Sequence, residues 1–228
     1  MLWGRRTEER QPPGFDRSRL LEARRKTWSC LRAIAESVRP GMQEEGAVAG
    51  AERILLEHGA EKNWHRVYVR FGRNTLLPYG TTSVPGITLT AEDIYFIDIG
   101  PVFDGYEGDA GDTFTTGSSP ILKQCKQDVR RIFSDVKRHW KTGNTRGQEL
   151  YAYAEARARE RGWILNLNVD GHRLSQFPHH VLFKGGLATI GYAPVKDAWM
   201  LELQIKHPVE PFGAFYEDLL TEETLKAP

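Results

Sequence analysis

Residues Ile94–Gly117 read IYFIDIGPVFDGYEGDAGDTFTTG and carry the signals from which the fold is inferred. The segment Ile94–Ile99 is apolar apart from Asp98 and predicts a β-strand. A hairpin is expected over Val102–Gly117, with its turn at Asp104-Gly105, because Asp-Gly supports tight turns. Asp98 closes the apolar run, and Asp109 follows eleven residues later, across the predicted hairpin. Two antiparallel strands could therefore bring these two carboxylates together.

Helices are predicted on both sides of this stretch, because apolar residues recur there at helical spacing. The expected elements are helices at Ser18–Val38, Gln43–Glu57, Pro120–Trp140 and Arg146–Arg161, and strands at His65–Phe71, Ile94–Ile99 and Ile164–Val169. A Pro-Gly break at Gly41 and a helix end at Gly59 correspond to similar signals at Gly143 and Gly162, with offsets of 102 and 103 residues. This weak repeat predicts two similar halves in one domain, with helices outside a curved sheet and a site between the halves.

The composition indicates a soluble globular chain and excludes several classes of function. The 228 residues carry 31 Lys and Arg against 30 Asp and Glu, which argues against bulk attraction to nucleic acid or anionic lipid. No apolar run is long enough for a transmembrane helix. The charged N-terminus has no apolar core of a secretory signal, and only two cysteines occur, so we expect a cytoplasmic protein. Residues 1–18 are expected to form a flexible arm, and residues 19–228 the folded domain.

Two further acids and two histidines stand out because of where they lie. Glu202 and Glu217 each interrupt an apolar, strand-like run, as Asp98 does. A buried carboxylate is costly without a partner, and a shared cation is a common remedy for several of them. His172 follows Gly171, and His179 comes seven residues later. Each feature alone has a plainer interpretation: the acids can end strands or lie in solvated turns, and an isolated histidine is more often structural than a metal ligand.

In combination, these motifs resemble those of the M24 metallopeptidases, which include methionine aminopeptidase, aminopeptidase P and prolidase. The resemblance covers about residues 20–225 and rests on motifs in a fixed order: Arg39–Met42, Arg70–Asn74, Asp98 with Gly105-Tyr106 and Asp109, Thr113-Phe114 with Gly117, Gly171-His172 with His179, and Glu217-Asp218. It implies the pita-bread fold, a single α+β domain with pseudo-two-fold symmetry, a curved antiparallel sheet and helices on its outer face.

The resemblance also implies a site with two divalent metal ions. Asp98 would bind one ion, Asp109 and Glu217 would bridge both, and His172 and Glu202 would complete the second. Glu202 could also move a proton, and His179 would stabilise the oxyanion or bind the substrate. Four carboxylates and one imidazole favour Mn²⁺, Co²⁺ or Fe²⁺ over a zinc site of the thiolate type.

The activity that the resemblance implies is hydrolysis of the N-terminal bond of short peptides by metal-activated water, of the Xaa-Pro aminopeptidase or dipeptidase type. Two alternatives are a creatinase-like hydrolase of a small non-peptide amide or amidine, and a catalytically silent pita-bread binding protein. We expect a peptide substrate and no nucleic-acid or membrane partner. A homodimer is also compatible with the resemblance, because homodimers are common among similar proteins. The N-terminal domain of the creatinase type is not expected in a chain of this length.

The chain departs from the family pattern at a few positions near the expected site. Tyr79 stands five residues after Asn74, where the family often has histidine. Arg173 follows His172 in place of a small residue and is expected to narrow the pocket or add charge. His180 follows His179, where the family usually has glutamate, and Tyr216 replaces the usual arginine before the final Glu-Asp. Asp112 is an additional acid near Asp109, either supporting the site or exposed to solvent.

Overall fold

The computed structural model describes residues 7–179 and 183–224. Its main feature is an antiparallel sheet of six strands in the order β2-β3-β6-β9-β8-β7. Along the sheet the strands are β2 (Tyr68–Phe71), β3 (Ile94–Ile99), β6 (Ala110–Thr115), β9 (Gly213–Leu219), β8 (Met200–Lys206) and β7 (Ile164–Leu165). A smaller sheet is formed by β1 (Lys62–Asn63), β4 (Pro101–Phe103) and β5 (Tyr106–Glu107).

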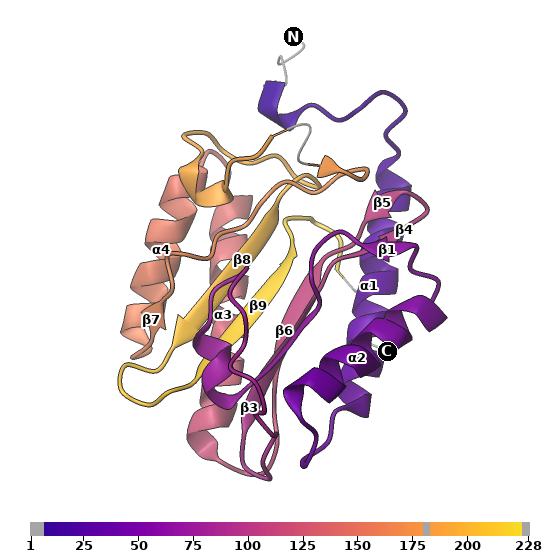
Figure 1. Ribbon diagram of the computed structural model, residues 1–228. Helices are drawn as coiled ribbons and strands as arrows, with labels where there is room; N and C mark the ends of the chain where they lie inside the picture. Colours follow the sequence, from indigo (N-terminus) through magenta and orange to yellow (C-terminus); the bar gives the residue numbers. More distant parts are fainter. Residues whose placement is uncertain (1–6, 180–182, 225–228) are drawn as a thin grey trace.

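Each half of the chain contributes two helices and three strands of the large sheet, as the weak repeat predicts (Figure 1). The helices are α1 (Arg17–Ser37), α2 (Glu44–Glu57), α3 (Pro120–Lys141) and α4 (Gly147–Glu160), and short 3₁₀ turns occur at Thr7–Glu9, Gly72–Leu76 and Leu187–Thr189. Side chains alternate between the two faces of each strand. Ile97 of β3 packs in one core with α1 and α2, and Leu203 of β8 packs in another with α3 and α4. The opposite face of the sheet carries Asp98 and Glu202 beside a smaller buried cluster that includes Phe96 and Phe215.

Most predicted elements are confirmed, and two strands are shorter than expected. The β4–β5 hairpin turns at Asp104 and Gly105, which both have positive φ. The predicted strand Ile164–Val169 keeps only its first two residues in the sheet. There the Asn166 side-chain oxygen accepts a hydrogen bond from the Asn168 N–H at 3.1 Å, a local turn that competes with strand pairing. The strand expected from His65 begins at Tyr68, which leaves His65 in the connection before β2.

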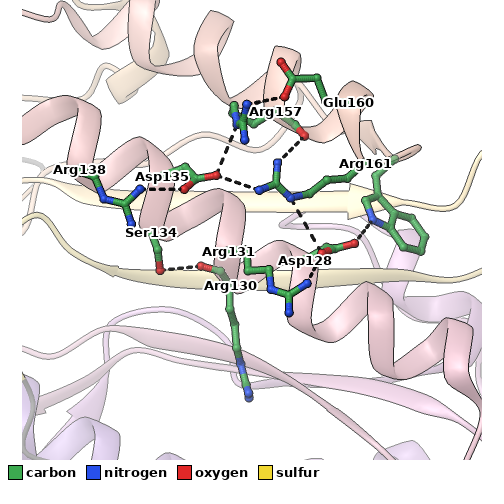
Figure 2. A network of polar contacts seen from close by, with 10 residues as sticks. Asp128, Arg130, Arg131, Ser134, Asp135, Arg138, Arg157, Glu160 and Arg161 are labelled. Carbon is green, nitrogen blue, oxygen red and sulfur yellow. Dashed lines mark hydrogen bonds and ion pairs between the residues drawn. The ribbon is translucent and has the colours of Figure 1, made fainter.

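Ion pairs fasten α4 onto α3 (Figure 2). Asp135 of α3 accepts contacts from Arg157 and Arg161 of α4, at 3.4 and 3.0 Å. Asp128 is buried two turns earlier in α3 and accepts a hydrogen bond of 2.9 Å from the Trp163 indole N–H just after α4. Each exposed ion pair contributes little to the stability of the fold. The buried hydrogen bond between Asp128 and Trp163 also fixes the position at which the chain leaves α4 for β7. The network therefore sets the position of α4, which reaches the site described below.

The first described residues pack against the second half of the chain. The buried carboxylate of Glu9 accepts hydrogen bonds from the Val195 backbone N–H at 2.9 Å and from the Trp199 indole N–H at 3.0 Å. Within residues 7–179 and 183–224, none of the helices combines the length and apolar character needed to cross a membrane.

Candidate metal centre

A row of four residues crosses the middle of the large sheet. Asp98 of β3 is paired with Gly111 of β6, Gly111 with Glu217 of β9, and Glu217 with Glu202 of β8. Residues opposite one another in antiparallel strands point to the same face, so the three carboxylates share the face that the helices leave open. Gly111 is required in this row, because a Cβ there would lie 2.3 Å from the Phe215 ring and 3.0 Å from Glu217 Oε1.

Asp109 lies directly before β6, and its carboxylate is held between two imidazoles. Its side chain is 1% exposed. Oδ2 lies 2.9 Å from Nε2 of His172, and Oδ1 lies 3.4 Å from Nε2 of His65. The same nitrogen of His65 is 3.5 Å from Oδ1 of Asp98. Each oxygen of Asp109 therefore faces a different histidine.

The two imidazoles are oriented in the same way. Nδ1 of His172 lies 2.7 Å from the Arg173 carbonyl oxygen, and Nδ1 of His65 lies 2.7 Å from the Arg66 carbonyl oxygen. A carbonyl can only accept, so Nδ1 carries the hydrogen in both rings and Nε2 is directed at the acids. This arrangement, with one ring nitrogen bonded to a backbone carbonyl and the other directed at a site, is typical of metal-ligating histidines.

Strong electrostatic coupling sets the protonation of the Asp109 group. Burial raises the pKa of Asp109, but its contacts with His172 and His65 outweigh burial and lower the pKa to about 2. Burial lowers the pKa of His172, but Asp109 outweighs it and raises that pKa to about 9. Burial likewise lowers the pKa of His65, whereas the charges of Asp98 and Asp109 raise it to about 9. Asp109 is thus ionised and neutralised by its neighbours.

The acids of the row resist ionisation together. Burial raises the pKa of Asp98 to about 6, against the opposing effect of His65 and with the charge of Asp109 adding to the rise. Burial raises the pKa of Glu202 to about 8, with the charges of Asp98 and Asp109 adding to it and His172 opposing it. Burial and the charges of Asp109 and Asp98 also place the pKa of Glu217 well above its ordinary value. Four buried carboxylates this close require positive charge, supplied either by protons or by cations.

The donor atoms fit divalent cations. His65, Asp98 and Asp109 each offer one donor atom within 4.8 Å of the others, and so do Asp109, His172 and Glu217. Asp109 is common to both groups. Oε1 of Glu217 is buried and has no hydrogen-bond partner among the described residues. A donor set rich in carboxylate oxygen with some imidazole suits divalent metals that prefer oxygen and nitrogen over thiolate. Glu202 lies in neither group, although it stands next to Glu217 in the sheet register.

Tyr151 of α4 connects two segments that carry residues of the site. Its buried hydroxyl donates a hydrogen bond of 2.8 Å to the Glu202 carbonyl oxygen and accepts one of 2.6 Å from the Gly171 N–H. It thereby links the strand that carries Glu202 to the residue that precedes His172.

His179 lies next to the site and is held by a buried glutamate. Its Nδ1 is 2.9 Å from Oε2 of Glu107, and its backbone N–H donates to Oε1 of Glu107 at 2.8 Å. Its ring stacks on the ring of His172 with centroids 5.1 Å apart, and Trp64 meets it edge-on at 5.0 Å. His179 is not among the residues that line the cavity described next.

A cavity of about 280 Å³ opens onto the row of acids. The acids of the row, Asp109, His65 and His172 form part of its wall, and the rest is formed by Trp64, Tyr79, Asn168, Val169, Asp170, Lys184, Gly185 and Gly186. A space of this size is suited to a small ligand, and the acids lie where such a ligand would meet them.

Comparison with known protein families matches residues 18–197 to metallopeptidase family M24. This chain belongs to metallopeptidase family M24. No curated protein matches the chain. The M24 assignment confirms the resemblance on which the sequence analysis relied.

Solved structures share the fold of this M24 chain at low sequence identity. An X-Pro aminopeptidase from Thermotoga maritima has a TM-score of 0.72 and 19% identity, with 91% of this chain and 61% of the other chain covered. A prolidase from Pyrococcus horikoshii has a TM-score of 0.72 and 18% identity, with 95% and 62% covered. A methionine aminopeptidase from Thermotoga maritima has a TM-score of 0.73 and 14% identity, with 93% and 98% covered. The chain therefore spans about three-fifths of the aminopeptidase P and prolidase relatives, and the predicted pita-bread architecture is confirmed.

The departures from the M24 pattern have different structural outcomes. Tyr79 lies on the cavity wall, and burial together with nearby acidic groups raises its pKa to about 12, so it stays a neutral phenol. Arg173 does not narrow the pocket as expected: it is buried beneath the site, where its guanidinium donates to the Ala198 and Arg10 carbonyl oxygens. His180 lies outside the described residues.

Asp112 is neither solvated nor a part of the site. It follows Gly111 in β6 and so points to the helix face, where Arg130 of α3 binds both of its oxygens at 2.7 Å. Tyr216 points to the same helix face, packing between the two cores.

Three residues of this M24 site could not be found from the sequence. His65 fell inside a predicted strand, and nothing in its spacing separates it from an ordinary strand residue. Glu107 lies between Asp98 and Asp109, yet its burial and its bond to His179 depend on tertiary contacts. Tyr151 was one apolar position of a helix, and only the packing of α4 shows its two hydrogen bonds.

Proposed function

We propose that this chain is a metal-dependent exopeptidase that hydrolyses the N-terminal bond of short peptides, of the Xaa-Pro aminopeptidase or dipeptidase type. The observation that carries the proposal is the position of Asp109, whose two oxygens belong to two separate groups of donor atoms on either side of it. A carboxylate placed in this way is suited to bridging two cations. Membership of a metallopeptidase family and the fold shared with an X-Pro aminopeptidase and a prolidase support the choice of reaction.

The residues proposed to hold the cations are those expected from the sequence. Asp98 would bind one ion, Asp109 and Glu217 would lie between both, and His172 and Glu202 would bind the other. Mn²⁺, Co²⁺ or Fe²⁺ suit this set better than zinc. When bound, two such ions supply an acidified water and polarise a carbonyl oxygen.

Two side chains are proposed to act on the substrate. The buried carboxyl of Glu202 lines the cavity, and we assign it the transfer of a proton during hydrolysis. His179 is held by Glu107 and stacked on His172, and we assign it to hydrogen bonding with the reacting carbonyl group of a peptide.

The charged groups on the cavity wall complement the two ends of a short peptide. Asp170 lines the cavity but belongs neither to the two groups of donor atoms nor to the row of acids on the sheet. Lys184 is an exposed cation that lines the same cavity. An ammonium group near Asp170 and a terminal carboxylate near Lys184 would orient a dipeptide across the cavity. This favours a free carboxyl end over an amidated one.

The test is hydrolysis of a panel of Xaa-Pro dipeptides, Xaa-Pro tripeptides and non-proline peptides by protein loaded with Mn²⁺ or Co²⁺. We expect release of the N-terminal residue, with amidated dipeptides cleaved more slowly than free acids. Glu217→Gln removes one proposed ligand and should abolish cleavage. Glu210→Gln changes an exposed acid in the turn between β8 and β9 and is the matched control, which should cleave like the unchanged chain.

Protein with bound metal that cleaves none of these peptides would contradict the peptidase proposal. Equal rates for free and amidated dipeptides would contradict the assignment of Lys184 but not the reaction itself.

A further inference from the structure

A second imidazole reaches the acids from the first half of the chain. His65 lies in the connection between β1 and β2, and its side chain is 3% exposed. Its Nε2 approaches Oδ1 of Asp98 at 3.5 Å and Oδ1 of Asp109 at 3.4 Å. His65 is not one of the five residues that we expect to bind metal. It is also not one of the two residues, Glu202 and His179, that are proposed to act on the substrate.

The ring of His65 is fixed in this position by the backbone around it. Its Nδ1 donates to the Arg66 carbonyl oxygen at 2.7 Å, which matches the bond from His172 to the Arg173 carbonyl. A bond of this kind fixes the tautomer and the direction of the other nitrogen in metal-ligating histidines. Nε2 of His65 is thus presented to the acids in the same way as Nε2 of His172.

Gly100, between β3 and β4, leaves the space that the His65 ring occupies. A Cβ on Gly100 would lie 2.2 Å from Cδ2 and 2.3 Å from Nε2 of His65, and 2.6 Å from Nε1 of Trp64. The Trp64 ring meets the His65 ring edge-on, with centroids 4.3 Å apart, and its indole N–H donates to the Gly108 carbonyl oxygen at 2.9 Å. Gly100 and Trp64 therefore both contact the imidazole and limit its movement.

We propose that His65 is a ligand, through Nε2, of the cation held by Asp98 and Asp109. The inference rests on the proposed metal centre and extends it. Each half of the chain would then supply one imidazole and two carboxylates: His65, Asp98 and Asp109 from the first, and His172, Glu202 and Glu217 from the second. Both cations would have a nitrogen donor, which favours Fe²⁺ or Co²⁺ over Mn²⁺ at the His65 position.

The competing role for His65 is that of a charged partner for two acids, and it makes the opposite prediction. A partner of that kind competes with a cation for the same oxygens, so removing it would leave metal affinity unchanged or increase it. Removing a ligand lowers the affinity and reduces the number of nitrogen donors. The two roles are thus distinguished by the direction of the change.

The experiment measures Co²⁺ bound per chain and its affinity by equilibrium dialysis with elemental analysis. The variants are His65→Gln and His65→Ala, with His172→Ala as the comparison within the site and His58→Gln, an exposed histidine at the end of α2, as the control. We expect two ions in the unchanged chain and in His58→Gln. In both His65 variants one of the two ions should bind about 100-fold more weakly, or be lost.

Pulsed EPR on the unchanged chain loaded with Mn²⁺ gives a readout that does not depend on a variant folding. Nitrogen couplings from two imidazoles per chain are expected. Couplings from one imidazole, or His65 variants that bind both ions with unchanged or higher affinity while His172→Ala binds less, would overturn the assignment of His65. A chain that binds no Co²⁺ at all would instead overturn the metal centre as a whole, and the assignment with it.

Discussion

Replacing Tyr151 by phenylalanine tests how the site is held, because the change removes one hydroxyl and almost nothing else. That hydroxyl donates to the Glu202 carbonyl oxygen at 2.8 Å and accepts from the Gly171 N–H at 2.6 Å. Both groups are buried, and an unpaired buried polar group costs about 1–3 kcal/mol. Two such groups are left unpaired, so we expect Tyr151→Phe to lower the free energy of unfolding by about 2–6 kcal/mol. For a chain of this length that corresponds to a fall in Tm of roughly 4–24 °C.

The same change should weaken metal binding, because Glu202 and the residue before His172 both lose their support. Substitutions of residues that orient ligands commonly cost about 10–100-fold in metal affinity. The assays are urea denaturation of the metal-free chain and a Co²⁺ titration. Tyr153→Phe is the control: it makes the same chemical change in the same helix, where the half-buried Tyr153 ring stacks on His139.

A Tyr151→Phe chain that is as stable as Tyr153→Phe and binds Co²⁺ as tightly would refute this reasoning. Loss of stability without loss of metal affinity would show that the hydroxyl supports the fold but does not position the ligands.

Two further predictions concern the acids and the sheet beneath them. In the metal-free chain the pKa of His172 is raised to about 9 and that of Glu202 to about 8, so the folded state holds protons that the unfolded state releases. The stability that these protons confer is present at pH 5 and lost as the pH rises to 9, so the Tm of the metal-free chain should fall over this range. Metal and protons compete for the same side chains, so the difference in Tm between Mn²⁺-loaded and EDTA-treated protein should widen, and a difference that narrows as the pH rises would contradict this. Gly111→Val should cost about 1–3 kcal/mol and impair metal binding, because the new side chain meets the Phe215 ring, and a variant with unchanged urea midpoint and metal content would show that the row tolerates a side chain there.

The sequence predicts the elements well where a local pattern decides them. The apolar run Ile94–Ile99 becomes β3 with the predicted bounds, and the Asp-Gly turn forms where expected. Asp98 and Asp109 converge as expected, although through pairing of β3 with β6 rather than within one hairpin. Where two local signals compete, prediction fails: the Asn166 side chain ends β7 after two residues, although Leu167 and Val169 continue an alternating strand pattern.

The rest of the site depends on contacts between residues far apart in the chain. Nothing near His65 in the sequence indicates that Gly100 leaves space for its ring, since the two meet only after β1 pairs with β4. Arg173 was expected beside the metal because it follows His172, but neighbours in an extended segment point in opposite directions, and its guanidinium is buried on the other side. Asp112 reaches Arg130 for the same reason, one residue away from the row.

We expect two cations, one on either side of Asp109. Crystals soaked with Mn²⁺ and measured at wavelengths on both sides of the manganese absorption edge test this most directly, because the anomalous difference map shows only the metal. Two peaks are expected, one between Asp98 and Asp109 and the other between His172 and Glu202. A single peak, or peaks away from the Asp109 carboxylate, would contradict it.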